Sequence, residues 1–187
     1  MDIILASASP RRRELFKVIT ECFSAVSTDA DETLPDDIPP DDASAYLAVI
    51  KAESAVKLHP DSIIIGCDTT VICDGRILGK PRNADQCREF LRMLSGKTHH
   101  VVTGCAILFH DKKKVFSVST DVTFRALSDE DINWYVATDE PYDKAGGYAV
   151  QGSGALLVEG ICGDYFNVVG LPVSRLNTEL TDFINSL

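Results

Sequence analysis

Three consecutive arginines, Arg11 to Arg13, follow Ser9-Pro10 and the short apolar run Ile3 to Ala6. The apolar run predicts a strand, and Ser9 with Pro10 is typical of the first positions of a helix. The arginines then fall in the first helical turn, where free N–H groups and the helix dipole already present positive charge. Three cations there indicate an anionic ligand, because guanidinium groups bind phosphate oxygens bidentately. The alternative is three solvated surface arginines.

An aspartate follows a second apolar run. Ile63 to Ile65 predicts a buried strand, and Asp68 comes after it, where ligands bind in open α/β sheets. An ionised carboxylate can hold a divalent metal, or orient and deprotonate a water molecule. Aspartate followed by threonine also forms local turns, so a catalytic role and a turn role have equal weight on these residues alone.

Two lysines and a glutamate are further candidates for an anion or metal site. Lys80 lies in Gly79-Lys80-Pro81-Arg82, where the proline stiffens a basic pair. Lys51 lies in an alanine-rich helix, and Glu32 in an acidic loop that could supply a second metal carboxylate. Each also has a plain interpretation: an edge-strand lysine, an exposed helix stripe and a solvated loop.

A glycine cluster surrounds Gln151. Gly146, Gly147, Gly152 and Gly154 allow the backbone to approach a ligand closely, and the Gln151 amide could match the edge of a base. The sequence contains no Walker A motif, no G-x-G-x-x-G fingerprint and no G-x-S-x-G elbow. Their absence argues against the common classes of nucleotide-binding protein and hydrolase that carry these motifs.

The composition limits the partners. The formal net charge is −10, with 28 acidic and 18 basic residues, which disfavours a broad nucleic-acid surface but not one small anionic ligand. No segment is long and apolar enough for a membrane span, and the start lacks the features of a signal peptide. We therefore expect a cytoplasmic protein. The six cysteines show no zinc or redox spacing.

At 187 residues the chain predicts a single domain, residues 1–187, with room for two lobes around a cleft. Hairpin signals argue against a purely parallel sheet, and intervening helices argue against a sandwich, so we expect an α/β fold with a mixed central sheet flanked by helices. Helices are predicted after Ser9, after Asp41 or Asp42, after Asn83, after Ser128 and after Gly170-Leu171-Pro172. Strands are predicted over Ile3–Ala6, Cys22–Ser27, Ser62–Gly66, Val71–Cys73, Arg76–Leu78, Thr98–Phe109, Val115–Phe124, Ala155–Cys162 and Tyr165–Val169.

Six segments follow one another in order along nearly the whole chain: Leu5-Ala6-Ser7-Ala8-Ser9-Pro10-Arg11-Arg12, Gly66-Cys67-Asp68-Thr69-Thr70-Val71, Gly79-Lys80-Pro81, Leu94-Ser95-Gly96-Lys97-Thr98-His99, Glu140-Pro141-Tyr142-Asp143-Lys144-Ala145-Gly146 and Val169-Gly170-Leu171-Pro172. Together they resemble the Maf proteins, a family of nucleoside triphosphate pyrophosphatases. The resemblance implies an elongated α/β fold similar to inosine triphosphate pyrophosphatases, with a deep cleft. It also implies metal-dependent cleavage between the α and β phosphates, giving a monophosphate and pyrophosphate.

The resemblance assigns roles by motif. Asp68 matches the family's proton acceptor, and its specificity positions match Arg11, Thr69 and Gln151. Further residues of the family's cleft match Ser7, Glu32, Lys51 and Lys80. The Asp-Lys-Ala-Gly and Gln-Gly forms resemble the branch acting on dTTP and UTP, and family members are often cytoplasmic homodimers linked to arrest of septum formation.

Charge neutralisation supplies a mechanism. We expect Arg11, Arg12, Lys51 and Lys80 to bind phosphate oxygens. We expect Mg²⁺ or Mn²⁺ to bridge Asp68, with Glu32, to the nucleoside triphosphate.

The base is expected to be a pyrimidine with an imide edge. The Gln151 amide can match part of the edge that thymine and uracil share, whereas cytosine presents a different donor pattern. Two alternatives stay open: a nucleotide-sensing regulator of septum formation whose hydrolysis is incidental, and an enzyme acting on another phosphorylated metabolite.

Overall fold

The computed structural model describes residues 1–187. The chain forms two compact units that alternate along the sequence. Unit 1 comprises Met1–Asp68, Thr103–Val118 and Gly170–Leu187, and unit 2 comprises Thr69–Val102 and Ser119–Val169.

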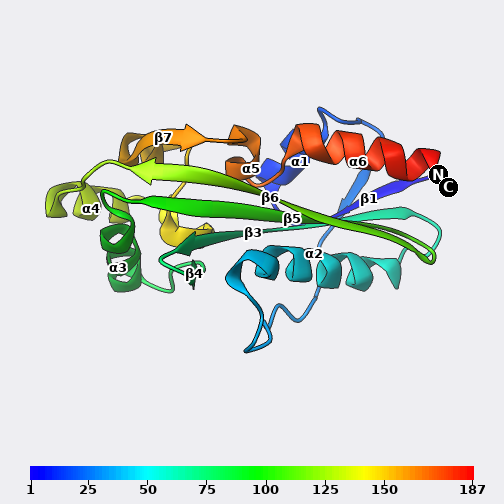
Figure 1. The fold of residues 1–187 in the computed structure, drawn as a ribbon, viewed down its shortest axis with the longest axis horizontal. Helices are drawn as coiled ribbons and strands as arrows, with labels where there is room; N and C mark the ends of the chain where they lie inside the picture. The colour runs from blue at the N-terminus through cyan, green and yellow to red at the C-terminus, as the bar shows by residue number, and fades with distance from the viewer. The chain divides into compact units, whose positions relative to one another are not determined.

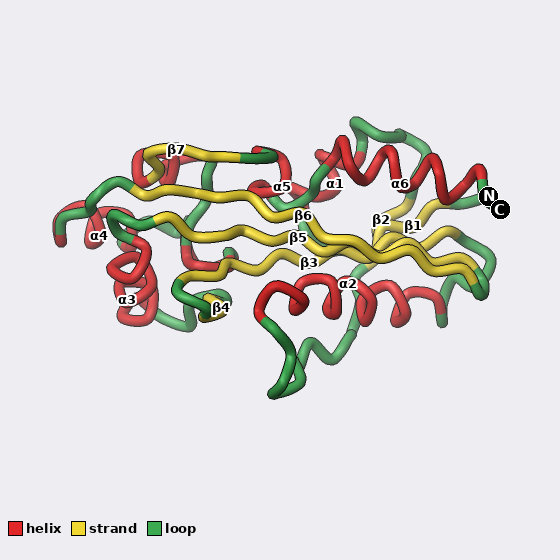
Figure 2. The backbone as a smooth tube through the Cα atoms, in the orientation of Figure 1, coloured by secondary structure: helices red, strands yellow, loops and turns green.

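The sheet of unit 1 has parallel strands at its N-terminal side. Strand β1 (Ile3–Ala6) pairs in parallel with β2 (Ser24–Val26) and with β3 (Ile63–Cys73). Strands β5 (Thr98–Phe109) and β6 (Lys112–Phe124) follow in the order β2-β1-β3-β5-β6. The tight turn between β5 and β6 is visible in the tube drawing (Figure 2).

Helices cover both faces of this sheet in unit 1. They are α1 (Pro10–Phe16), α2 (Pro40–Val56) and α6 (Val173–Asn185). Successive side chains of a strand point to opposite faces. Accordingly, Leu5 belongs to a core that includes residues of α1 and α6, whereas Ile4 belongs to a core that includes alanines of α2. Figure 1 shows α2 on one side of the strands and α6 on the other.

Unit 2 has antiparallel strands at its margins. Strand β4 (Arg76–Leu78) pairs with β3, and β7 (Val158–Cys162) pairs with β6. The helices of this unit are α3 (Ala84–Leu94), α4 (Asp129–Val136), the 3₁₀ turns η1 (Pro141–Asp143), η2 (Ala145–Gly147) and η3 (Gly152–Leu157), and α5 (Tyr165–Val169). Parallel pairs in unit 1 and antiparallel pairs in unit 2 confirm the predicted mixed α/β class.

Three predicted helix starts are confirmed by their capping hydrogen bonds. The Ser9 hydroxyl accepts from the Arg12 N–H at 3.4 Å, and Asn83 Oδ1 accepts from the Gln86 N–H at 2.9 Å. Ser128 forms a reciprocal capping box with Asp131. Each cap satisfies backbone donors that have no partner inside the helix.

The start of α2 was predicted wrongly. The helix begins at Pro40, Pro39 occupies the N-cap position without a capping hydrogen bond, and Asp41 and Asp42 lie inside the first turn. Proline has a backbone angle suited to the first helical position, and the aspartates there complement the positive end of the helix dipole.

The last predicted strand is also wrong, because Tyr165–Val169 forms helix α5. Asp164 Oδ1 accepts from the backbone N–H groups of Phe166 at 2.8 Å and Asn167 at 3.3 Å, as a helix cap does. The strand before it is shorter than predicted, since η3 extends to Leu157. None of the helices has the length and apolar character that a membrane span requires.

Candidate active site

Asp68 lies within strand β3, whereas the sequence placed it at the end of that strand. The strand continues through Thr69 and Thr70 to Cys73, because these threonines and the following Val71 and Ile72 favour extended backbone. The Asp68 residue is only 9% exposed. A carboxylate so buried needs a charged partner or several hydrogen bonds.

Lys51 of α2 is that partner. Its Nζ lies 2.5 Å from Asp68 Oδ1 and 3.0 Å from Glu32 Oε2. The Lys51 and Asp68 side chains are each 12% exposed, whereas the Glu32 side chain is 53% exposed. Unit 1 therefore joins three of the predicted site residues around one ammonium group. The interpretation of Lys51 as part of an exposed helix stripe does not hold.

Close packing of α2 on the sheet explains where Lys51 lies. A Cβ atom on Gly66 would come within 2.1 Å of the Ala48 carbonyl oxygen and 2.9 Å of Ala52 Cβ, so only glycine fits there. Residues three and four apart share one side of a helix. Lys51 lies three positions after Ala48 and directly before Ala52. Its side chain therefore leaves α2 beside the contact with Gly66 and reaches Asp68 on the same strand.

The carboxylates of Asp68 and Glu32 suit a divalent cation shared with a phosphate. Both oxygens lie within 3.0 Å of the same nitrogen, so the two carboxylates converge on one position. No group of three or more His, Cys, Asp or Glu side chains in the chain is arranged to hold a metal. Mg²⁺ commonly binds one or two carboxylates and completes its shell with water and substrate phosphates, which fits this donor set.

Ser7 and Arg12 are tied into the turn between β1 and α1. The buried Ser7 hydroxyl accepts from the Ser9 N–H at 3.2 Å. The Arg12 guanidinium donates to the carbonyl oxygens of Gly170 at 2.8 Å and Cys67 at 2.9 Å. Sequence reasoning missed this bracing, because neither carbonyl belongs to a recognisable motif. Arg12 therefore fixes backbone directly beside Asp68, and its proposed contact with phosphate stays a prediction.

Arg11 belongs to unit 1 as well, where it is half-buried in α1. The other predicted residues, Thr69, Lys80 and Gln151, belong to unit 2. Thr69 is half-buried, and Lys80 and Gln151 are exposed. Their roles stay predictions.

Within unit 2 the glycine-containing loop lies against the segment of Lys80. The Gly146 N–H donates to the Gly79 carbonyl at 3.0 Å, and a Cβ on Gly147 would lie 3.3 Å from the Pro81 ring. Gly146 has φ +71° and Gly147 φ +70°, which side chains rarely adopt. These glycines bring the loop to both neighbours of Lys80. The close approach to a ligand that the sequence suggested stays a prediction.

Sequence reasoning also missed Glu140. Both of its carboxylate oxygens accept hydrogen bonds from backbone N–H groups of the next loop, at Ser153 and Gly154. The only signal was its place in the chemically loaded stretch Glu140–Gly147. No pattern in that stretch predicts a contact with residues thirteen and fourteen positions further along the chain.

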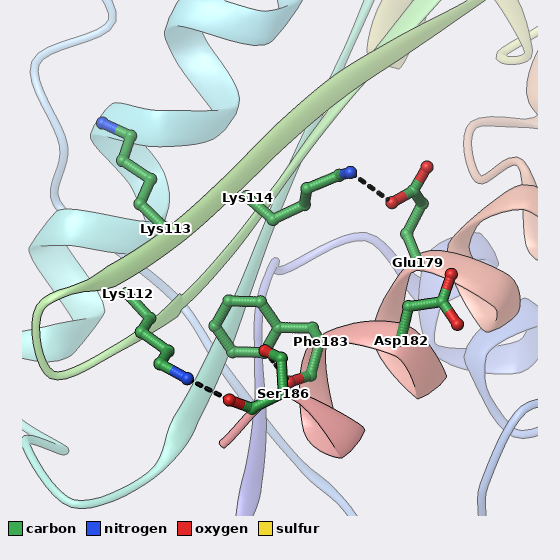
Figure 3. A pocket seen from close by; sticks show the side chains of 7 residues that line it. All are labelled: Lys112, Lys113, Lys114, Glu179, Asp182, Phe183 and Ser186. Atoms are coloured by element: carbon green, nitrogen blue, oxygen red, sulfur yellow. Dashed lines mark hydrogen bonds and ion pairs between the residues drawn. The ribbon is translucent and has the colours of Figure 1, made fainter.

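A pocket of about 420 Å³ lies elsewhere in unit 1, between the start of β6 and α6 (Figure 3). Its lining residues are Lys112, Lys113, Lys114, Glu179, Asp182, Phe183 and Ser186. Lys114 is paired with Glu179 at 2.8 Å, and Lys112 donates to the Ser186 carbonyl. None of the predicted site residues lines this pocket.

The family is established by comparison with known proteins. Residues 2–183 match the family model described as Maf-like protein, so the chain belongs to the Maf family. It is 47% identical to proteins named dTTP/UTP pyrophosphatase from Bacillus cytotoxicus, over 96% of this chain and 94% of the relative, and from Bacillus cereus, over 97% and 95%. The protein of the same name from Bacillus mycoides is also 47% identical, over 97% and 95%.

Among solved structures, the fold is similar to that titled "The structure of the Staphylococcus aureus Ham1 protein". The TM-score is 0.49 at 18% identity, and the likeness covers 66% of this chain and 72% of that chain.

Proposed function

We propose that this chain hydrolyses dTTP and UTP between the α and β phosphates, releasing the nucleoside monophosphate and pyrophosphate. Relatives that share nearly half of its residues over almost their whole length are named for this activity. The observation in the structure that supports the proposal best is the pair of Asp68 and Lys51, nearly buried and 2.5 Å apart.

In this proposal Asp68 orients and deprotonates the attacking water. The Lys51 ammonium, 2.5 Å from Asp68 Oδ1, compensates the negative charge that this nearly buried carboxylate needs as a proton acceptor. The Lys51 ammonium, with Arg11 and Lys80, neutralises charge on the phosphate oxygens. Catalysis of phosphoryl transfer depends mainly on such positioning and electrostatic stabilisation.

Asp68 and Glu32 would hold the divalent cation, Mg²⁺ or Mn²⁺. A bound cation of this kind supplies a more acidic water and further neutralises phosphate charge. The protein's own part is to keep the two carboxylates convergent, which Lys51 does by contacting both.

Base selection is assigned to Gln151, with Arg11 and Thr69. An amide can donate to one group and accept from another, as the imide edge of thymine or uracil requires. Cytosine presents donor and acceptor in the reverse order, so an amide held in one orientation would leave its groups unpaired, which costs binding free energy. The proposal extends to a cytoplasmic homodimer with a role in cell division.

The test is pyrophosphate release from dTTP, UTP and CTP in Mg²⁺ or Mn²⁺, by the parent chain, Asp68→Asn and Asp74→Asn. We expect dTTP and UTP to be cleaved and CTP to be a poor substrate. Asp68→Asn should remain folded by circular dichroism and lose at least about a hundredfold in kcat, since it removes the proton acceptor. Asp74 forms an exposed ion pair with Lys97 at 2.7 Å, so Asp74→Asn is the matched control and should keep full activity.

Near-normal turnover by Asp68→Asn contradicts its assigned role. Orthophosphate rather than pyrophosphate as the product contradicts the reaction. A hydrolysis-dead Asp68→Asn protein that still arrests septum formation in cells would favour the alternative of a nucleotide-sensing regulator.

A further inference from the structure

Glu140 binds the loop formed by residues 149–154, which contains Gln151 and runs into the start of η3. It lies between α4 and η1 and is half-buried. Its Oε2 accepts from the Ser153 N–H at 3.0 Å and its Oε1 from the Gly154 N–H at 2.9 Å. Two consecutive backbone donors thus bind the two oxygens of one carboxylate. A charged acceptor makes such hydrogen bonds stronger than neutral ones.

Tyr135 completes the attachment from the other end of the loop. Its hydroxyl donates to Glu140 Oε1 at 3.1 Å and accepts from the Ala149 N–H at 3.1 Å. Tyr135 is fully buried, so its hydroxyl is fixed by the surrounding core. Gln151 therefore lies between two anchored points, Ala149 and Ser153, while it is itself exposed.

Gly152 and Gly154 leave the space that these hydrogen bonds require. A Cβ on Gly152 would lie 2.7 Å from Glu140 Oε2, and Gly152 has φ +63°. A Cβ on Gly154 would lie 2.1 Å from the Ala149 carbonyl oxygen and 2.9 Å from the Tyr135 hydroxyl. Side chains at either position would displace the loop from Glu140 or Tyr135.

The protonation state of Glu140 agrees with this geometry. Burial opposes the charged form, but the N–H groups of Gly154 and Ser153 and the Tyr135 hydroxyl outweigh it and lower the pKa of Glu140. The carboxylate is therefore charged at neutral pH, and it can accept all three hydrogen bonds.

We propose that Glu140 is a positioning residue for base selection, which presents the Gln151 amide in one orientation by fixing the backbone of residues 149–154. The inference rests on the proposed function, in which Gln151 contacts the base. Glu140 acts through Gln151 and not on the phosphates, because the hydrogen-bond partners of its carboxylate are Tyr135 of α4 and the N–H groups of Ser153 and Gly154.

The decisive variant is Glu140→Gln. The amide nitrogen that replaces one oxygen cannot accept a backbone hydrogen bond, so one loop N–H loses its partner while the side chain keeps its shape. Asp139→Asn is the matched control, because the neighbouring Asp139 is exposed and the change in charge is the same. The measurement is kcat and KM for dTTP and CTP by pyrophosphate release, in the parent, both single variants, Gln151→Ala and Glu140→Gln with Gln151→Ala.

We expect Glu140→Gln to lower the ratio of kcat/KM for dTTP over CTP about tenfold, as loss of one well-formed hydrogen bond implies. The loss should appear in KM for dTTP, with kcat changed less than about threefold. Asp139→Asn should keep the parent ratio. In the Gln151→Ala background, Glu140→Gln should not change the ratio further, because the residue through which it acts is gone.

An equal loss for dTTP and CTP, or a further fall of the ratio without Gln151, overturns the inference and leaves the proposed function intact. A parent chain that releases no pyrophosphate from dTTP overturns the proposed function and the inference together. If Glu140→Gln does not fold, Tyr135→Phe replaces it, since it removes the hydroxyl that joins Glu140 to Ala149. An unchanged dTTP-to-CTP ratio in Tyr135→Phe then overturns the inference.

Discussion

Lys51 holds two carboxylates at once, and this gives its ammonium a larger structural effect than an ordinary surface ion pair. Asp68 and Glu32 both contact its Nζ, and Asp68 is nearly buried. Exposed pairs contribute little, whereas removing one partner of a buried pair leaves an uncompensated charge in a site of low polarity. The effect of Lys51 on stability should therefore be separable from its effect on phosphate binding.

Replacing Lys51 with Met should lower the free energy of unfolding by about 3 kcal/mol, because two convergent carboxylates lose their only shared cation. Mg²⁺ should then raise the melting temperature of Lys51→Met more than that of the parent, since the ammonium group no longer competes with the cation for the two carboxylates of the folded state. The measurement is thermal unfolding with and without MgCl₂. Lys57→Met, at the exposed end of α2, is the control. Equal Mg²⁺ shifts in Lys51→Met and the parent would contradict the cation site.

At the scale of elements, the position of Lys51 depends on how closely α2 approaches the sheet. Gly66 of β3 and Gly104 of β5 both face α2 backbone at distances that exclude a side chain. The small alanines Ala48 and Ala52 make the same approach possible from the helix side. The pair of Asp68 and Lys51 is thus brought together by glycines and alanines, which have no functional groups of their own.

Gly104→Ala should destabilise the protein by about 3 kcal/mol, because the new Cβ would lie 2.3 Å from the Ala45 nitrogen and 2.4 Å from the Ser44 carbonyl oxygen. Backbone atoms of a packed helix cannot move aside as a flexible side chain does. Gly160→Ala in β7 meets nothing within 4 Å, so it should change stability by less than about 0.5 kcal/mol. Urea unfolding of both variants gives the comparison. Similar unfolding midpoints would show that α2 can shift away from the sheet.

Sequence reasoning predicted features that depend on neighbouring residues and missed contacts between residues far apart in the chain. Helix starts at Ser9, Asn83 and Ser128 were predictable, because the capping residue and its partner lie within three positions. Asp68 was a candidate on its own residues, but its pairing with Lys51 requires knowing which helix packs on β3.

The error at α5 has a similar cause. Tyr165–Val169 has the aromatic and β-branched composition of a strand, and tertiary contacts decide against it. The Asn167 side chain donates to the Val101 carbonyl and the Thr120 hydroxyl, both at 2.9 Å. Such a buried amide needs these partners, and no pattern of period two reveals them.

At the scale of the whole molecule, stability should depend on a buried histidine in unit 2. His99 is 1% exposed and lies against the rings of Phe124 and Tyr148. Its Nε2 hydrogen-bonds to the Tyr148 hydroxyl at 2.7 Å, and its Nδ1 has no hydrogen-bond partner. Burial, with a smaller contribution from His100, lowers the pKa of His99 to about 4 from the ordinary 6.5.

The unfolded chain therefore binds this proton more readily than the folded one. The stabilisation is complete above about pH 6.5 and is lost as the pH falls towards about 4, a total of roughly 3 kcal/mol. Urea unfolding at about pH 7 and about pH 5 should show a smaller loss of stability in His99→Gln than in the parent. His110→Gln, at an exposed position in unit 1, is the control and should lose as much stability as the parent. Equal losses in His99→Gln and the parent would contradict this source of acid sensitivity.

The alternation of the two units along the chain has a consequence for biosynthesis. Every residue of unit 2 has been translated once Val169 is added, but unit 1 still lacks Gly170–Leu187. That last segment supplies Leu176, Leu180 and Phe183 to the core that contains Leu5 and Ile63. On the ribosome, strand β1 therefore cannot complete its packing until α6 has been synthesised. A premature stop codon near the 3′ end of the message would remove the α6 side chains from the core of unit 1 while sparing every residue of unit 2.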